Sequence, residues 1–499
     1  MRIRQGARPV VLDLFAGCGG LSLGFHSAGF LIGGAIEKDK RAAETHAFNF
    51  FGGREQGLYN KHNCVKDITE ITPRQLIREL FPEKDYKRSI DVIVGGPPCQ
   101  AFSRVGRAKL REVREHPEAF LQDPRGDLYQ SYLKYVRELR PVALLIENVP
   151  DMLNYGGRNI AEEICCCLSK MGYLSKYTLL NSAHYGVPQM RERTFIIAYA
   201  KEIEKYPVFP EPTHWINLPA GYRATRNVAI KNIISGLSED PYFIKPPEPN
   251  NNLQKAITAS QALEDLPHIT SHLEGKLKKG IRRFDILLKY KKDIKLLNYA
   301  ILMRNWPGFE NNTGVYDHVL RYLPRDYPIF QRMKPGDEYP QAYELALCIF
   351  NEKLEELKKN QNGQFHLGTP EYMELMKKTV PPYDSTKFPN RWRKLEPDKP
   401  VRTLTAHLGR DSYSHIHYDS EQGRTITPRE AARLQSFPDG FVFKGAMDAA
   451  FRQIGNAVPP LLANKLACTI GETLGVKTID IEAEVNNRIT NNIKQFAKS

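Results

Sequence analysis

One cysteine stands in a loop that two prolines stiffen. Cys99 belongs to the stretch 95-GGPPCQAFS-103, directly after a short apolar run, and Pro97 and Pro98 restrict the backbone before it. A thiol at the end of a buried strand becomes a nucleophile where a positive charge or a helix N-terminus lowers its pKa. The stretch alone leaves two other interpretations open, an inert buried thiol and a zinc ligand.

A zinc site finds little support in the remaining cysteines and histidines. Zinc needs three or four converging ligands, and the sequence contains no C-x₂-C pair. Cys165, Cys166 and Cys167 are adjacent in a helical context, so their thiols cannot turn toward one centre. His415 and His417 fit the alternation of a strand. We therefore expect no metal ion.

Charged side chains further along the chain could serve the same reaction as the thiol. Glu147 closes the apolar run 142-VALLIENV-149 and is a candidate general acid or base, with a helix cap or a surface acid as the alternative. Arg191 and Arg193 lie two apart in 188-PQMRERTFI-196. A strand would point both to one side, as a grip for a phosphate or a base carbonyl, and the alternative is a solvated charge run.

A glycine-rich turn in 13-DLFAGCGGLSLGF-25 suits a nucleoside ligand. Gly17 and Gly19 let a ligand approach the backbone, and a helix that starts there offers free N–H groups. The spacing breaks the dinucleotide pattern G-x-G-x-x-G. Glu37 follows about 20 residues on, where an acidic side chain can hold a ribose diol. The alternative is the tight turn of any α/β fold.

Alternating strands and helices are expected to position these residues. Short runs rich in Val, Ile and Leu occupy 8–15, 31–37, 90–96, 142–149, 175–182 and 194–200. A further strand is expected to end at Asp67 and Ile68, and 127–140 has a helical apolar face that includes Leu128. This alternation predicts an α/β fold with a doubly wound, mostly parallel sheet, whose carboxyl edge carries the site.

Bulk composition limits the class of protein. The chain has 499 residues, of which 41% are hydrophobic, and a net charge of +14. No apolar run approaches the roughly 18 residues that span a bilayer. The cysteine pattern is unlike a disulfide framework, so we expect a reducing, intracellular compartment, the cytoplasm. A nucleoid-associated location would follow from a nucleic-acid partner. The positive charge suits a polyanionic partner such as nucleic acid.

The patterns divide the chain into four segments. Residues 205–400 lack the βα alternation and include 275–295, with nine Lys or Arg against two acidic residues. That stretch either contacts phosphates or is an exposed helix. A regular helix is expected again near the C-terminus, where Thr427 and Glu430 form a capping box. We expect a catalytic domain, a smaller second domain, a return segment that completes the first, and a polar tail, at 1–204, 205–400, 401–475 and 476–499.

Taken in chain order, the motifs resemble those of the DNA (cytosine-5)-methyltransferase family of bacterial and phage modification methylases. They are the glycine turn at 15–20, Glu37, Asp67, PPCQ at 97–100, ENV at 147–149, QMRER at 189–193, ITPREAARLQSFP at 426–438 and GNAVPP at 455–460. The resemblance covers residues 8–200 and 400–472. The segment 205–400 occupies the place of the family's target recognition domain.

The resemblance implies methyl transfer from S-adenosylmethionine to carbon 5 of a cytosine flipped out of duplex DNA. Cys99 would add to carbon 6 as the catalytic nucleophile. Glu147 would hydrogen-bond ring nitrogen 3 and the exocyclic amine. Arg193 and Arg191 would hold the base carbonyl and a nearby phosphate, and their charge would lower the thiol pKa.

The same resemblance implies where S-adenosylmethionine binds. The residues expected to contact it are Phe15, Gly17, Gly19, Glu37, Asp67, Ile68, Pro97, Leu128, Asn456 and Val458. Phe15 would pack on the adenine, and Glu37 would bind the ribose. One position departs from the family's common form, because Lys38 follows Glu37 where an aromatic residue is frequent. One stacking contact to the adenine is therefore expected to be missing.

Partners follow from the resemblance as well. We expect double-stranded DNA as the partner, no membrane, a monomer, and a restriction-modification system with a cognate endonuclease. Three rival functions stay open: the same chemistry on tRNA, a nucleic-acid-binding protein without activity, and a nicotinamide-dependent dehydrogenase. The long middle segment favours DNA, the intact Cys99 and Glu147 favour activity, and the broken glycine pattern disfavours the dehydrogenase.

Overall fold

A mostly parallel sheet forms the centre of the computed structural model, which describes residues 6–52, 56–82, 89–98, 128–234, 240–292, 294–360 and 366–496. Within these residues, six strands pair in the order β2-β1-β3-β4-β7-β5. β7 runs antiparallel to both of its neighbours, and the other pairs are parallel. The strands β1 to β5 and β7 span Val10–Leu14, Leu31–Ile36, Val92–Gly95, Ala143–Asn148, Tyr173–Asn181 and Glu192–Ala200. The predicted fold class is confirmed.

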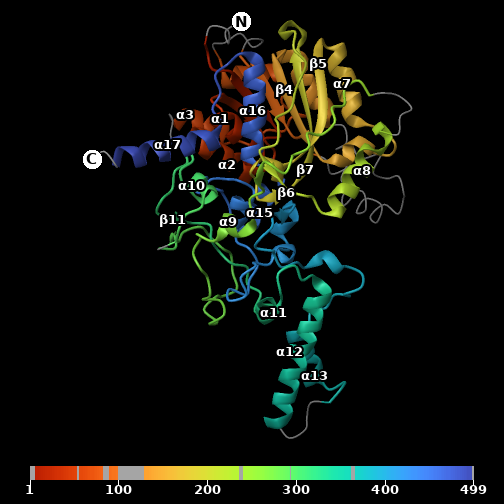
Figure 1. Cartoon of the computed structure of the whole chain (residues 1–499), viewed down its shortest axis with the longest axis vertical. Helices are drawn as coiled ribbons and strands as arrows, with labels where there is room; N and C mark the ends of the chain where they lie inside the picture. Colours follow the sequence, from red (N-terminus) through yellow and green to blue (C-terminus); the bar gives the residue numbers. More distant parts are fainter. Residues whose placement is uncertain are drawn as a thin grey trace.

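Helices cover both faces of the sheet, which is why its strands are continuously apolar. Val11 packs among side chains of α1 and α16, whereas Leu12 packs on the other face among those of α6 and α7. Figure 1 shows α16, from the C-terminal part of the chain, beside α1 from the N-terminal part. These helices α1, α6, α7 and α16 span Gly20–Ser27, Leu128–Leu139, Ile160–Lys170 and Pro460–Leu474.

The strand expected to end at Asp67 and Ile68 is wrong. Residues 65–67 have no regular structure and follow the short helix α3 (Gln56–His62). The Lys66 N–H donates to the Glu37 carbonyl at 2.9 Å, just beyond the end of β2. The chain then turns, and the Asp67 carboxylate accepts the Thr69 N–H at 3.0 Å. Asp67 therefore closes a turn beside the sheet instead of ending a strand within it.

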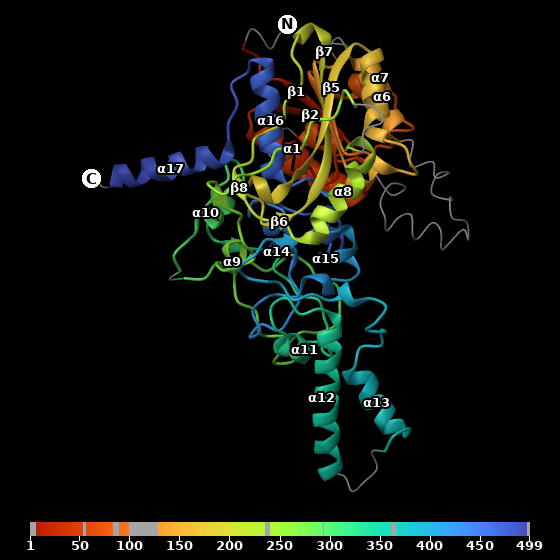
Figure 2. The ribbon, with the colours of Figure 1, turned by 45° about the vertical axis from the view of Figure 1, so that its right-hand side comes forward.

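Residues 205–400 contain helices, loops and two-residue strands. The strands β8 to β11 span His214–Trp215, Gln254–Lys255, Leu288–Lys289 and Gly314–Val315. The helices α8 to α13 span Ala220–Ile234, Ala259–Leu263, Asn298–Arg304, Tyr327–Arg332, Tyr339–Asn360 and Pro370–Thr379. The alternative helix over 275–295 is wrong, because Gly275 and Gly280 adopt φ values of 71° and 156° and Leu288–Lys289 pairs with β11. Figures 1 and 2 show α12 and α13 as an arm that projects from the rest of the molecule.

The C-terminal segment returns to the sheet. β12 (Val401–Arg402) pairs with β6 (Gln189–Met190), and the predicted capping box of Thr427 and Glu430 is confirmed at the start of α14 (Pro428–Leu434). The helix α15 (Met447–Asn456) leads into α16. Within the expected polar tail, Ile481–Phe496 form the helix α17, and its Ile481 and Val485 side chains are buried. No helix among the described residues is long and apolar enough to cross a membrane.

Candidate functional site

A cleft of about 1710 Å³ runs along the carboxyl edge of the sheet. Its volume exceeds the roughly 300–1,000 Å³ that is usual for one small ligand. The predicted residues that line it are Phe15, Gly17, Glu37, Asp67, Ile68, Pro97, Leu128, Glu147, Arg191, Arg193, Asn456 and Val458. Cys99 lies outside the described residues, although Pro97 and Pro98 before it line the cleft. One cleft thus gathers residues that are far apart in the chain.

The glycine turn after β1 is held by Glu37 at the end of β2. The Gly17 N–H donates to Glu37 Oε2 at 2.8 Å, and the Asp39 N–H donates to Oε1 at 2.6 Å. Burial raises the pKa of Glu37, and these N–H donors oppose that rise. A carboxylate offers about four acceptor positions. Two bonds to the backbone therefore orient Glu37 and leave acceptor positions for ligand hydroxyls.

Gly19 is not among the residues that line the cleft. Its φ is 101°, and a Cβ there would lie 2.5 Å from the Phe50 ring and 3.0 Å from the His46 ring. Helix α2 (Lys40–Phe51) thus packs directly on this position. Glycine is required here by the left-handed backbone and the close helix, whatever ligand the neighbouring turn binds.

Three buried polar side chains, Asp13, Ser22 and His46, are linked by hydrogen bonds beneath the turn. Asp13 was not among the residues expected at the site. Asp13 lines the cleft, and its Oδ2 accepts the Ser22 hydroxyl at 2.6 Å. The Ser22 Oγ lies 2.9 Å from Nε2 of His46. Burial raises the pKa of Asp13 to about 7, and it lowers that of His46 to about 3. These hydrogen bonds join β1, α1 and α2 under the turn.

Lys38 and Asp67 form an ion pair at the other side of Glu37. The Lys38 Nζ lies 2.5 Å from Asp67 Oδ2, with side-chain exposures of 78% and 13%. The Lys38 hydrogen bond is the largest cause that lowers the pKa of Asp67 to about 2, and bonds from Thr69 add to it. Both residues line the cleft. Lys38 thus stands where the resembling family often has an aromatic residue, and its ammonium group holds the Asp67 carboxylate in place.

The sequence resemblance implies that S-adenosylmethionine binds in this cleft. On that expectation, Lys38→Ala should raise its dissociation constant about twofold to fivefold, the range of an exposed ion pair. Without Lys38, the Asp67 carboxylate loses the partner that orients it at the cleft wall. Isothermal titration at low and high salt measures the effect, which shrinks as salt screens the pair. Lys40→Ala, an exposed lysine that does not line the cleft, is the matched control. A fall in kcat at saturating cofactor would contradict a role limited to binding.

Glu147 and Arg193 meet where β4 and β7 pair. Arg193 Nε lies 3.1 Å from Glu147 Oε1, and the two side chains are 16% and 12% exposed. A Cβ on Gly96 would lie 3.0 Å from Glu147 Oε2, and Asn148 Nδ2 donates to the Pro97 carbonyl at 3.2 Å. The end of β4 is thereby fixed against the loop that leads to Cys99. The pair places a carboxylate and a guanidinium together at the wall of the cleft.

The expected two-pronged grip of Arg191 and Arg193 is not what the structure shows. Arg191 is buried, and its Nη1 donates to the carbonyls of Leu404 and Gly455 at 3.0 and 3.1 Å. Arg193 turns to Glu147 instead. The strand β7 begins at Glu192, so Arg191 precedes the alternation on which the expectation rested. Arg191 joins the sheet edge to the return segment, next to Asn456.

Residues from 387 to 452 contribute a basic wall to the cleft, which no sequence expectation included. The cations that line it are Lys387, Arg391, Arg393, Arg402 and Arg452. The stretch 388-FPNRWRK-394 alternates aromatic and basic residues, which was the available signal. Trp392 in that stretch is fully buried, so only part of the pattern faces the cleft. The site therefore lies between an acidic edge of the sheet and a basic wall from distant sequence.

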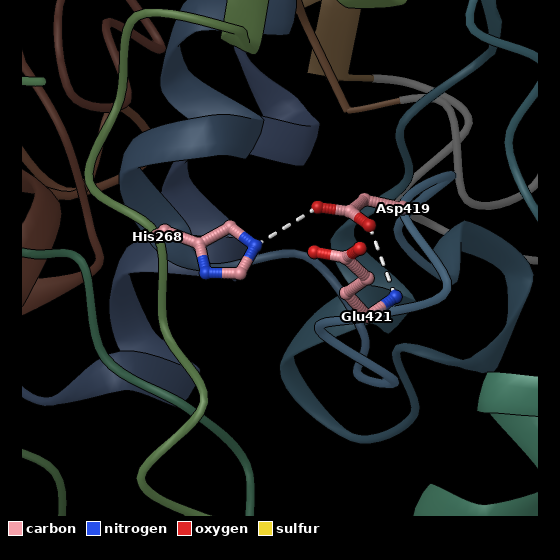
Figure 3. Close-up of side chains that lie close together, drawn as sticks. All are labelled: His268, Asp419 and Glu421. Atoms are coloured by element: carbon pink, nitrogen blue, oxygen red, sulfur yellow. Dashed lines mark hydrogen bonds and ion pairs between the residues drawn. The ribbon is translucent and has the colours of Figure 1, made fainter.

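One cluster outside the cleft has side chains that metals favour. Possible ligand atoms of His268, Asp419 and Glu421 lie within 4.8 Å of one another, and Figure 3 shows the imidazole directed at Asp419. His268 Nε2 lies 3.1 Å from Asp419 Oδ2, and Oδ1 accepts the Glu421 N–H at 3.0 Å. Gln422 also donates to Asp419 at 3.0 Å. These hydrogen bonds explain why the three side chains lie close together without a metal ion. None of the three residues lines the cleft.

Known proteins share this arrangement over nearly the whole chain. The sequence profile described as C-5 cytosine-specific DNA methylase matches residues 10–472. A protein of Oceanobacillus iheyensis with a type II methyltransferase name is 38% identical over 459 residues, which cover 92% of this chain and 94% of that one. The type II methyltransferase M.AgeI of Thalassovita gelatinovora is 30% identical over 485 residues, with 92% and 98% coverage.

A solved structure supports the same fold. It is described as a DNA modification methyltransferase encoded within an Escherichia coli prophage, and it superposes with a TM-score of 0.56 at 23% identity. The match covers 94% of this chain and 99% of that one. The profile match and the two relatives confirm the family resemblance that the motifs indicated. This chain belongs to the C-5 cytosine-specific DNA methylases, and it is a DNA (cytosine-5)-methyltransferase that acts on DNA.

Proposed function

We propose that this protein transfers a methyl group from S-adenosylmethionine to carbon 5 of a cytosine within a specific duplex DNA sequence. The observation that carries the proposal is the Glu147–Arg193 pair, 3.1 Å apart, in the same cleft as the glycine turn and Glu37. A base-binding pair and a nucleoside-binding turn at one sheet edge suit a reaction between a nucleobase and a nucleoside cofactor. Residues 205–400 would supply the sequence recognition.

The residues at the turn fit S-adenosylmethionine. Glu37 is oriented by two backbone N–H groups and keeps acceptor positions for the two ribose hydroxyls. Ile68 and Leu128 offer apolar contact, and the exposed Asn456 offers polar atoms from the opposite side. When bound, S-adenosylmethionine supplies a methyl group activated by the adjacent sulfonium. The chain's own part is to hold that methyl group in front of the base.

The base-binding side needs a cytosine that has left the duplex, because carbons 5 and 6 are inaccessible inside the stack. We propose that Glu147 hydrogen-bonds nitrogen 3 and the exocyclic amine, which thymine does not offer in the same pattern. Arg193 holds the carbonyl oxygen and keeps Glu147 in place. The Cys99 thiolate would add to carbon 6, and carbon 5 would take the methyl group while the demethylated thioether leaves. A base, such as a water molecule, would then remove the carbon 5 proton, the bond between sulfur and carbon 6 would break, and the thiolate would be released.

Trapping on 5-fluorocytosine tests this proposal. Fluorine at carbon 5 replaces the proton that must leave, so a covalent protein–DNA adduct should accumulate with S-adenosylmethionine and resist denaturing electrophoresis. We expect Cys99→Ala to form no adduct. Cys348→Ala removes an exposed thiol on α12 that does not line the cleft, so it should trap DNA like the unchanged protein. An adduct with Cys99→Ala would show that another residue is the nucleophile.

The same protein preparation can test the alternative substrate and the biological setting. Methyl incorporation into tRNA but not duplex DNA would overturn the DNA proposal. Bisulfite sequencing of DNA from cells that express the protein would give the recognised sequence. We propose that this sequence is shared with a cognate restriction endonuclease, as the type II names of the relatives suggest, and that the protein acts as a monomer.

A further inference from the structure

An exposed aromatic side chain stands in the basic wall of the cleft. Phe388 is 58% exposed, and it lines the cleft together with Glu147 and Arg193. Among the described residues, other large hydrophobic side chains are exposed, but Phe388 alone of that set lines the cleft. A single exposed hydrophobic side chain is ordinary on a protein surface. What points to a binding role for Phe388 is its place in the same cleft as the Glu147–Arg193 pair.

The backbone around Phe388 is anchored, so its exposure is not that of a loose loop. Pro389 opens the short helix η8 (Pro389–Arg391). The guanidinium of Arg391 lies 3.6 Å above the Tyr383 ring and 3.4 Å from Asp411. Trp392 is fully buried and stacks on Tyr413 with ring centroids 4.6 Å apart. These contacts anchor the segment directly after the exposed ring.

Cations line the same cleft as the ring, and two of them share one carboxylate that holds them in place. Glu338 Oε1 pairs with Arg393 at 2.6 Å and with Arg402 at 2.9 Å. Both arginines line the cleft, as do Lys387 and Arg391. Backbone phosphates of nucleic acid would meet such groups favourably. An aromatic face between positive charges is the combination that binds strands of nucleic acid, since each base has a face on which a ring can stack.

The cleft continues beyond the part that a cofactor and one base would fill. A second hollow of about 740 Å³ shares Arg193, Arg393 and Arg402 with the first and extends to α8. Figures 1 and 2 show the chain after α13 running from the projecting arm toward α15. The basic segment that carries Phe388 therefore borders two adjoining hollows, and Arg193 of the Glu147–Arg193 pair lines both of them.

We propose that Phe388 stacks on the DNA bases next to the target cytosine and occupies the space that this base vacates. This inference rests on the proposed function and names the side chain that stabilises the opened duplex. Taking a base out of the stack loses its stacking contacts, and an aromatic ring at the gap replaces part of them. The anchored backbone presents the ring without a further ordering cost.

A fluorescent base analogue tests the proposal directly. A duplex with 2-aminopurine at the target position brightens when that base leaves the stack. We expect Phe388→Ala to reduce this emission and to lower kcat/KM about tenfold to a hundredfold, the range of one lost base stack. Phe388→Trp should preserve both the emission and kcat/KM. Phe388→Leu should give values between those of Phe388→Ala and the unchanged protein. Met373→Ala removes a side chain of similar exposure, 57%, outside the cleft and should change neither.

A mismatched target separates stacking from damage to the fold. Opposite a mismatch the target base leaves the stack at lower cost, so methylation by Phe388→Ala should recover most of its loss. Unchanged affinity for S-adenosylmethionine would show that the variant is folded. Unchanged emission and kcat/KM in Phe388→Ala, or an equal deficit on matched and mismatched duplexes, would overturn the inference. If the unchanged protein methylates no DNA, the proposed function itself fails.

Discussion

Glu147→Gln should lower kcat about a hundredfold to ten-thousandfold, the range of a lost general acid or base. The dissociation constant for duplex DNA should change little. The substitution keeps the shape of a side chain that is 12% exposed and removes its charge next to Arg193. A neutral amide cannot accept or release a proton as nitrogen 3 of the base changes its charge during the reaction. The loss should therefore appear in the chemical step.

Single-turnover kinetics and equilibrium DNA binding, measured on the same duplex, check this expectation. Glu192→Gln is the matched control, because Glu192 is also buried and paired with an arginine, Arg226, at 2.6 Å. Glu192 lines the second hollow but not the cleft that contains Glu147, so its variant should keep the single-turnover rate at saturating DNA. Equal losses in DNA affinity and kcat/KM for Glu147→Gln, with kcat unchanged, would mean that the carboxylate acts in ground-state binding.

Strand and turn positions on the sheet could be predicted from sequence because they depend on local patterns. Runs such as Val10–Leu14 are buried on both faces, and near-continuous apolarity signals that. The strand expected to end at Asp67 failed for a related reason. A few apolar residues near the edge of a sheet resemble a strand in sequence. Here the Lys66 N–H donates to the Glu37 carbonyl, just beyond β2, and the chain then turns away.

Side-chain roles at the site depended on contacts between distant parts of the chain. The spacing of Arg191 and Arg193 suggested one shared direction, but Arg191 bonds carbonyls at Leu404 and Gly455. No local pattern shows which carbonyls a folded chain brings to a guanidinium. The basic wall around Phe388 was missed for the same reason, since sequence alternation does not reveal that Trp392 enters the core while Phe388 faces the cleft.

Arg433→Met should destabilise the protein by about 3–5 kcal/mol, the cost of removing one partner from a buried ion network. Arg433 is fully buried in α14 and pairs with Asp265 at 2.8 Å and with Asp439 at 2.6 Å. Arg304 also pairs with Asp265, at 2.5 Å. Methionine fills much of the arginine's volume but offers no donor. Two buried carboxylates then lose their shared cation.

Urea unfolding measures this loss as a lower midpoint at an unchanged m-value. Arg41→Met is the matched control, because Arg41 is 52% exposed and pairs with Glu44 at 2.7 Å on one helix. That variant should lose less than about 0.5 kcal/mol. A loss below about 1 kcal/mol for Arg433→Met would mean that the remaining partners compensate. These are Arg304 for Asp265 and Arg429, 3.9 Å from Asp439, for Asp439. The buried network would then be redundant.

The pH dependence of that loss distinguishes an unpaired charge from poor packing. In the unchanged protein, burial raises the pKa of Asp265, but Arg433 and Arg304 outweigh it and leave the pKa below its usual value. The stability this carboxylate contributes is therefore present above its unfolded pKa of about 3.9 and disappears at more acidic pH. In Arg433→Met the pKa of Asp265 should rise instead. Lowering the pH from 8 to 5 should then protonate the buried carboxyl and narrow the difference in unfolding free energy between the two proteins. A difference that stays constant over this range would assign the loss to packing, because a cavity or a strained side chain has no proton to bind.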